Sequence, residues 1–222
     1  MNHIMVVSKI VAVFLLFAFI HSLCVQEKVK FLYSGLFGER VAKGTYRLLY
    51  VLFSALTTLL AFLYIYSLPD YYIFRPPAWF RWPMHLVQLS GLLFAASTFR
   101  TIDNYEFLGI RQFIRFLKGQ QIGGDIEGIT INRLITRGAY RVVRHPMYLG
   151  GIVIFSFEPN ITRNWLTVTV LADLYFIYGA VAEEKRLLKQ FGKEYEDYMK
   201  RVHRFLPNLK GLKEYVNELL SY

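Results

Sequence analysis

The stretch TRGAYRVVRHPMYLG, which spans Thr136–Gly150, joins a basic and aromatic segment directly to an apolar one. Proline is tolerated in a helix mainly in the first turn, where its missing N–H breaks no hydrogen bond. The stretch therefore predicts that a helix begins near Pro146, with His145 at or next to its cap. A helix start leaves backbone N–H groups unpaired at the positive end of the helix dipole.

Basic and aromatic side chains gather around this predicted helix start: Tyr140, Arg141, Arg144, His145 and Tyr148. Together with the helix dipole, they suit an anionic group, such as the carboxylate of an amino-acid-like cofactor. The alternative interpretation is interfacial anchoring, because Arg and Tyr also collect at membrane boundaries for packing reasons. The spacing alone leaves both interpretations open.

The composition indicates a membrane protein, because 55% of the 222 residues are hydrophobic and 17% are aromatic. The formal net charge of +10 does not favour nucleic acid as a partner, since the basic residues alternate in blocks with apolar runs. Cys24 is the only cysteine, which excludes an intrachain disulfide and a thiolate metal cluster. The five histidines lack the spacing of metal ligands, so no metal site is predicted.

Apolar segments of the chain predict an all-α membrane protein with about five transmembrane helices. The segments are Met5–Cys24, Leu48–Leu68, Met84–Phe99, Tyr148–Phe157 and Trp165–Val181. The last two are interpreted as a C-terminal helical hairpin that begins near Pro146 and ends near Glu183. Pro69–Pro83, which holds four prolines, is interpreted as an irregular interfacial loop before the third segment.

The basic residues predict the orientation of the chain in the membrane. The first, third and final connectors hold 5, 8 and 9 of the 26 Lys and Arg residues. This alternation places the N-terminus outside, and Thr136–Gly150 and the C-terminus on the cytoplasmic face. Amphipathic cytoplasmic helices are predicted over Gln112–Gln121 and from Glu183 to about Pro207. Residues 1–222 are interpreted as one integral-membrane domain, with three spans in 1–100 and a cofactor-binding core in 101–222.

The predicted hairpin brings distant residues together, because the start of one helix and the end of the other lie side by side. We therefore expect His145 and Tyr148 to meet Glu183 and Glu184 at the cytoplasmic membrane boundary. A basic helix start beside paired acids can hold both a carboxylate and an ammonium group or ribose hydroxyls. S-adenosylmethionine carries all of these groups. A structural Arg–Glu network that closes the hairpin mouth is the alternative.

The residues also resemble a known family. RHPMYLG after TRGAYRVV, followed by EE, FGKEYEDY and V-x-RFLP, resembles the integral-membrane methyltransferases typified by isoprenylcysteine carboxyl methyltransferase, over about Thr136–Pro207. Upstream, FAFIHS, TYRLLY and DNYEFLGIRQ are more similar to the methanethiol S-methyltransferase and NnrU branch. The hairpin turn departs from that pattern, because it reads FEPN where an aromatic and a small residue are expected before the proline.

The resemblance implies a pocket for S-adenosylmethionine without a dinucleotide-binding fold, and a small thiol or another lipophilic acceptor that arrives from the membrane lipid. The cofactor-binding residues that it implies, together with those from the hairpin geometry, are Gln112, Tyr140, Arg144, His145, Pro146, Tyr148, Gly150, Glu183, Glu184 and Tyr195. A thiol reacts as its thiolate, so a proton acceptor would help, and His21 and Asp103 are the candidates. Methylation of prenylcysteine carboxyl groups or of phospholipid amines, and a non-enzymatic transport or assembly role, are the alternatives.

Overall fold

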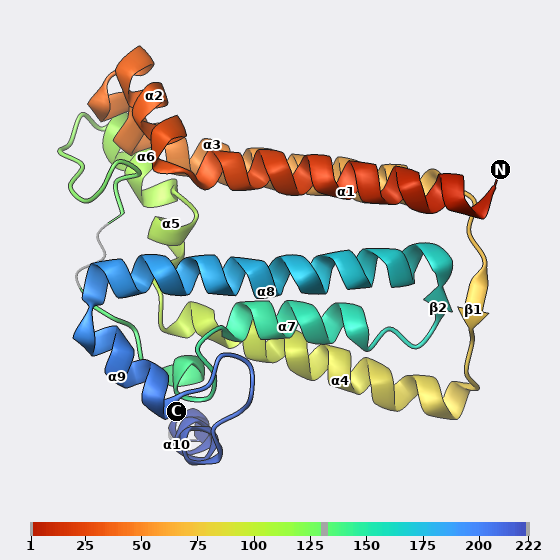
Figure 1. Cartoon of the computed structure of the whole chain (residues 1–222). Helices are drawn as coiled ribbons and strands as arrows, with labels where there is room; N and C mark the ends of the chain where they lie inside the picture. Colours follow the sequence, from red (N-terminus) through yellow and green to blue (C-terminus); the bar gives the residue numbers. More distant parts are fainter. Residues whose placement is uncertain (1, 130–132, 221–222) are drawn as a thin grey trace. The chain divides into compact units, whose positions relative to one another are not determined.

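The computed structural model describes residues 2–129 and 133–220, and the chain forms two compact units (Figure 1). Met1–Pro69 and Ile102–Asn132 make up unit 1, and Asp70–Thr101 and Arg133–Tyr222 make up unit 2. The units therefore alternate along the chain. The segment after Pro69 groups with the C-terminal half, whereas the sequence interpretation grouped it with the preceding spans.

Unit 1 is built from helices α1 (His3–Val25), α2 (Glu27–Phe37), α3 (Glu39–Ser67), α5 (Asn104–Phe107) and α6 (Ile110–Leu117). The long helices α1 and α3 lie side by side, while α2 and α6 pack on α3 (Figure 1). Most of the length of α1 and α3 carries exposed apolar side chains, as expected of a surface in contact with lipid. The predicted span Met5–Cys24 lies within α1, and the predicted span Leu48–Leu68 lies in α3 up to Ser67, with Leu68 as the C-cap.

A buried ion cluster ties the loop after α6 to the rest of unit 1. The Glu127 carboxylate is paired with the Lys30 ammonium group from α2 and lies 3.4 Å from an Arg47 guanidinium nitrogen from α3. Arg47 also donates a 2.7 Å hydrogen bond to the Phe107 carbonyl oxygen. We refer to Lys30, Arg47 and Glu127 as the Glu127 cluster.

Unit 2 contains α4 (Ala78–Ser97), α7 (Pro146–Ser156), α8 (Arg163–Phe191), α9 (Lys193–Arg201) and α10 (Leu209–Leu220), with two 3-10 turns at Thr98–Arg100 and Gly138–Arg141. The short strands β1 (Tyr72–Phe74) and β2 (Ile161–Thr162) pair in antiparallel fashion. The predicted hairpin is confirmed, because α7 and α8 pack together on either side of the turn that contains β2. A bend at Gly192, with φ of 51°, separates α8 from α9.

Helices α4 and α7 approach each other closely because their contact consists of small residues. A Cβ on Gly150 would lie 2.5 Å from the Ala95 Cβ, and a Cβ on Gly91 would lie 2.6 Å from a Val153 methyl carbon. Small residues at such crossings are typical of helices that associate in membranes, where close backbone contact replaces the hydrophobic effect.

Three helices of the described chain are long and apolar enough to cross a membrane, namely α1, α3 and α8. Several boundaries differ from the sequence interpretation. Helix α4 begins at Ala78 and includes Pro83, so the end of the expected loop is helical. The helix predicted over Gln112–Gln121 is α6, which spans Ile110–Leu117. The tail helix predicted to reach about Pro207 ends with α9 at Arg201, and α10 follows Pro207.

Candidate functional site

The start of α7 has the geometry predicted for it. Pro146 occupies the first turn of α7, and His145 is the N-cap residue. The His145 side chain is buried, with 4% of its surface exposed. No side-chain hydrogen bond caps the helix from His145, so its imidazole is directed to other partners.

Those partners form a buried cluster around one carboxylate of α8. Arg144 donates to Glu184 Oε1 through Nε at 3.0 Å and Nη2 at 2.7 Å. Arg204 reaches the same carboxylate through Nε at 3.0 Å and Nη2 at 2.5 Å, and His145 Nε2 lies 3.2 Å from Oε1. We refer to Arg144, His145, Glu184 and Arg204 as the Glu184 cluster. Paired guanidinium contacts of this kind are the stronger class of hydrogen bond.

The segment after α9 returns to the start of α7 and completes the cluster. The backbone N–H of Arg144 donates to the His203 carbonyl at 2.9 Å, and that of His145 to the Arg204 carbonyl at 3.3 Å. The Arg144 guanidinium also donates to the Val202 carbonyl at 2.6 Å. The hydrogen bonds to Glu184 raise the pKa of Arg204. Arg204 was not among the predicted site residues, although it lies in the RFLP motif that contributed to the resemblance.

A second carboxylate lies beside the cluster and is more accessible. The Glu183 side chain is 33% exposed, and its Oε2 lies 3.6 Å from His145 Nδ1. The Tyr148 hydroxyl is hydrogen-bonded to the Glu183 carboxylate. The Tyr148 ring stacks on the His145 imidazole, with 5.5 Å between ring centroids. Burial, and then the Glu183 carboxylate, raise the pKa of Tyr140 to about 12.

Two tyrosines of α9 differ in how their hydroxyl groups are satisfied. The Tyr198 hydroxyl donates a 2.7 Å hydrogen bond to the Tyr140 carbonyl oxygen. The Tyr195 hydroxyl is buried without a hydrogen-bond partner among the described residues. Burial, and then the charge of Glu184, raise the pKa of Tyr195 to about 12. An unpaired buried hydroxyl is costly, and one next to a charged cluster is a candidate ligand contact.

The structure brings together most, but not all, of the predicted site residues. Those of unit 2 that gather at the hairpin mouth are Tyr140, Arg144, His145, Pro146, Tyr148, Glu183, Glu184 and Tyr195. Gly150 belongs to the same helix, but its α-carbon faces Ala95 of α4. Arg141 is turned away to α10, where it lies 3.7 Å from Glu214 and 3.6 Å from Glu218.

The other three predicted residues belong to unit 1. His21 Nε2 lies 2.7 Å from the Tyr50 hydroxyl, between α1 and α3. Asp103 caps α5 and lies 2.6 Å from an Arg111 guanidinium nitrogen. The backbone N–H of Glu106 is the main cause of the lowered pKa of Asp103. Gln112 is buried and donates a 3.0 Å hydrogen bond to the Glu106 carbonyl oxygen.

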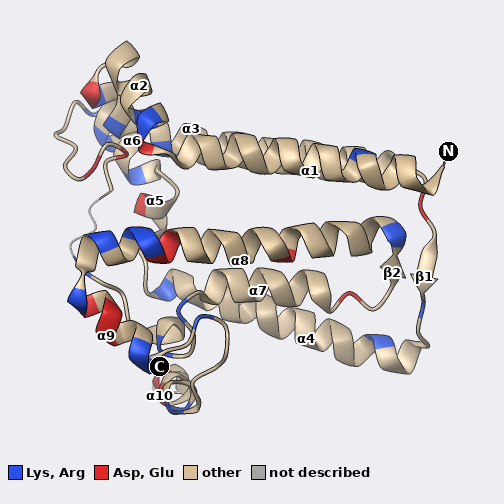
Figure 2. Cartoon of the chain, in the orientation of Figure 1, with Lys and Arg blue, Asp and Glu red and all other residues tan. Residues whose placement is uncertain are grey.

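The apolar part of helix α8 and the part that contributes to this site differ in charge. Figure 2 shows most of the charged residues of α8 near α9, while Asp173 lies in the middle of the helix and Arg163 at its end beside β2. The hairpin mouth therefore combines guanidinium donors, one accessible carboxylate and stacked aromatic rings at the end of an apolar helix. This set can bind a zwitterionic molecule that also has an aromatic part.

No group of three His, Cys, Asp or Glu side chains within 2–129 and 133–220 is arranged to hold a metal ion.

These features define a helical membrane protein with a polar site at the mouth of a helical hairpin. Residues 9–158 match the NnrU protein family, and the chain belongs to this family. The branch that the sequence resemblance predicted is thereby confirmed.

Relatives of known name are methyltransferases. Methanethiol S-methyltransferase 1 of Bradyrhizobium diazoefficiens is 30% identical over 192 residues, which cover 86% of this chain and 64% of the relative. Methanethiol S-methyltransferase of Pseudomonas deceptionensis is 31% identical over 120 residues, or 54% of this chain and 42% of the relative. A probable protein-S-isoprenylcysteine O-methyltransferase of Oryza sativa subsp. indica is 35% identical over 79 residues, or 34% of this chain and 41% of the relative.

The chain thus spans 64% of the length of the first of these relatives, which is less than two thirds. No solved structure matches the chain.

Proposed function

We propose that this chain is an S-adenosylmethionine-dependent membrane methyltransferase that converts a small thiol to a thioether. The observation that carries the proposal is the Glu184 cluster, with the accessible Glu183 carboxylate and the unpartnered Tyr195 hydroxyl beside it. The similarity to methanethiol S-methyltransferases supports the choice of a thiol as acceptor.

The residues at the hairpin mouth fit the chemistry of S-adenosylmethionine. Arg144 and the N-terminus of α7 suit its carboxylate, and Glu183 suits its ammonium group or ribose hydroxyls. Stacked aromatic rings such as those of His145 and Tyr148 suit a sulfonium or an adenine ring. The Tyr195 hydroxyl, which lacks a partner in the described structure, is available for one further polar contact.

Two carboxylates have different roles in this proposal. Glu184 accepts hydrogen bonds from both arginines and from His145, so its role is to hold Arg144 and His145 in position. Glu183 is the carboxylate with exposed surface and is therefore the one proposed to contact the cofactor. Pro146 and Gly150 are retained as proposed cofactor residues on the family resemblance alone, whereas Gln112 also has a buried Oε1 without a hydrogen-bond partner in the described structure.

The bound cofactor would supply an electrophilic methyl group, and the chain would supply alignment and proton removal. Transfer to a thiol forms a carbon–sulfur bond, breaks the bond from the methyl carbon to the sulfonium, and releases the thiol proton. Holding the reactants in line provides most of the acceleration that such a displacement allows. Of the two proposed proton acceptors, His21 is favoured over Asp103, because the backbone N–H of Glu106 and then the ion pair with Arg111 stabilise the Asp103 carboxylate without its proton.

The finer membrane arrangement is also a proposal. We infer that α4 and the α7 segment complete about five spans, because α4 and α7 pack through small residues as membrane helices do. The alternation of basic connectors supports an N-terminus outside, with the cofactor site and C-terminus in the cytoplasm.

A second acceptor class is favoured by one observation. The relative from Oryza sativa is named for isoprenylcysteine, and its similarity covers 34% of this chain. Carboxyl methylation needs no base, so it would proceed without His21 or Asp103. Phospholipid amine methylation and a non-enzymatic transport or assembly role are the remaining alternatives.

The test is transfer of label from methyl-labelled S-adenosylmethionine by the purified protein in detergent. The acceptors are a short alkyl thiol, a prenylated cysteine and a phosphatidylethanolamine. Label in a volatile thioether supports the proposal, whereas label in either of the other products assigns a different acceptor. Absence of label in all three, together with no cofactor binding, would favour the non-enzymatic class.

A further inference from the structure

Helix α6 of unit 1 lies at the depth where a membrane changes from apolar to polar. The uncharged run of α3 begins at Leu48, and the glycine before α6, Gly109, packs against the backbone of Arg47 and Leu48. Farther along, Phe116 packs against Gly44, and Gly119 lies near the Arg40 guanidinium. Helix α6 therefore runs along the polar first turns of α3, just outside its apolar part.

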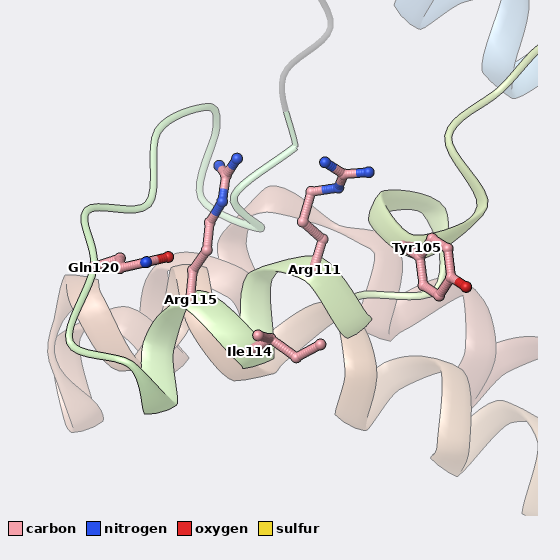
Figure 3. Close-up of a pocket in the computed structure, with 5 residues that line it drawn as sticks. All are labelled: Tyr105, Arg111, Ile114, Arg115 and Gln120. Atoms are coloured by element: carbon pink, nitrogen blue, oxygen red, sulfur yellow. The ribbon is translucent and has the colours of Figure 1, made fainter.

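A surface cavity of about 260 Å³ opens beside α6 and is lined by Tyr105, Arg111, Ile114, Arg115 and Gln120. Arg111 and Arg115 project from α6 in the same direction, with Tyr105 near one end and Gln120 near the other (Figure 3). These two arginines are one helical turn apart, so their guanidinium groups can share one ligand. Asp103 neutralises part of this charge through its 2.6 Å contact with Arg111.

Apolar surface adjoins this basic cavity. Ile114, which lines it, is 44% exposed, and Leu117 on the next turn of α6 is 67% exposed. The cavity therefore offers guanidinium groups for an anion, with the aliphatic Ile114 in its lining and Leu117 on the adjoining surface for a hydrocarbon chain.

We propose that this cavity binds the phosphodiester headgroup of an anionic membrane lipid through Arg111 and Arg115. The boundary position of α6 brings the guanidinium groups to headgroup depth, where each basic residue gains from the anionic surface. A guanidinium group binds phosphate oxygens in bidentate geometry, which a diffuse surface charge does not. The exposed Ile114 and Leu117 favour a lipid over a free phosphate. This inference does not rest on the proposed function, although Asp103, the less favoured proton acceptor, contacts Arg111.

Native mass spectrometry of the whole chain in detergent tests the proposal by counting retained lipids during titration with phosphatidylglycerol or phosphatidylcholine. We expect one phosphatidylglycerol to bind, with affinity reduced about tenfold by Arg115→Gln and likewise by Arg111→Gln. Lys118→Gln removes the same charge from the end of α6 but not from the cavity lining, and should change the affinity by about twofold or less.

Equal weakening by Lys118→Gln and Arg115→Gln would overturn the proposal, because it would mean diffuse attraction. Displacement of the lipid by an equal concentration of glycerol 3-phosphate would also overturn it, in favour of a site for free phosphate. Thermal unfolding of each variant in detergent shows whether it is folded. Arg115 is exposed, so its substitution should leave the unfolding temperature unchanged.

Discussion

Each unit of this molecule contains a buried carboxylate held by two basic side chains, and the two clusters differ in what surrounds them. Glu127 is 5% exposed and Glu184 is 4% exposed, so burial does not distinguish them. The Glu127 carboxylate contacts only Lys30 and Arg47 among the ion pairs of the described structure. The Glu184 carboxylate is saturated by two guanidinium groups and an imidazole, with an accessible carboxylate and an unpaired hydroxyl nearby.

The comparison shows that a buried ion pair alone does not identify a functional site. Such a pair connects segments of a fold, and its removal from one side leaves an uncompensated charge. The Glu127 cluster connects a loop to α2 and α3. The Glu184 cluster also connects segments, but the partly exposed Glu183 carboxylate lies beside it. This carboxylate, together with the Tyr195 hydroxyl, is what a ligand can bind.

The largest effect is expected at Glu184. Glu184→Gln leaves Arg144 and Arg204 without their counter-ion, and should lower the free energy of unfolding by about 3–5 kcal/mol. Thermal unfolding in detergent measures this loss, and binding of S-adenosylhomocysteine should disappear with it. Glu194→Gln, on the exposed surface of α9, is the matched control and should change neither property. An unchanged unfolding temperature for Glu184→Gln would contradict the structural role of the cluster.

Glu127→Gln should have a smaller effect, confined to stability. It removes the partner of Lys30 and Arg47, with an expected loss of about 3 kcal/mol in the free energy of unfolding. The affinity for S-adenosylhomocysteine, measured by calorimetry at a temperature where the variant is folded, should stay within about twofold. A large loss of affinity would remove the distinction between the two clusters.

Tyr195→Phe should lower cofactor affinity without lowering stability. Its hydroxyl has no partner in the described structure, so its removal should weaken only the binding of a ligand. We expect the affinity for the cofactor to fall by about three- to tenfold. Tyr198→Phe is the matched control on the same helix. Loss of its hydrogen bond to the Tyr140 carbonyl should lower the free energy of unfolding by about 1 kcal/mol and leave affinity unchanged. The reverse pattern would be inconsistent with a ligand contact at Tyr195.

The smallest effect is expected at Asp103. Its ion pair with Arg111 is largely exposed, so Asp103→Asn should lower the free energy of unfolding by less than about 1 kcal/mol at pH 7. Because the folded pKa of Asp103 is lowered, this stabilisation is present above its unfolded pKa. It is lost as the pH falls through the folded pKa. Unfolding of both proteins across acidic pH should show the difference shrinking; a constant difference would contradict this account.

The sequence predicted the hairpin and its charged mouth because local rules determine them. Pro146 is favoured in the first turn of a helix over its interior, and a short turn between two apolar segments requires an antiparallel pair. These two constraints were enough to bring His145 and Glu184 together. The apolar lengths of α1 and α3 were predicted for a similar reason, since an uncharged run of that length has few alternatives.

Other features depend on long-range contacts that periodicity does not encode. Arg204 reaches Glu184 because the segment after α9 folds back along Val142–His145, and nothing near Arg204 in the sequence predicts that return. Helix α4 joins the unit of α7 through the fit of Gly91 to Val153 and of Gly150 to Ala95. Such a fit depends on two distant sequence positions at once. The order of apolar segments along the chain therefore did not reveal the grouping of α4 with α7.

Whether the hairpin mouth is the cofactor site can be decided by comparing the binding of S-adenosylhomocysteine to the wild-type protein and to Glu183→Gln. Glu183 is partly exposed and is not needed to neutralise the arginines, so its substitution should leave the unfolding temperature unchanged. We expect measurable binding to the wild type and an affinity about 10- to 100-fold lower in the variant. Equal affinities, or no binding to the folded wild-type protein, would contradict the assignment of the hairpin mouth as the cofactor site.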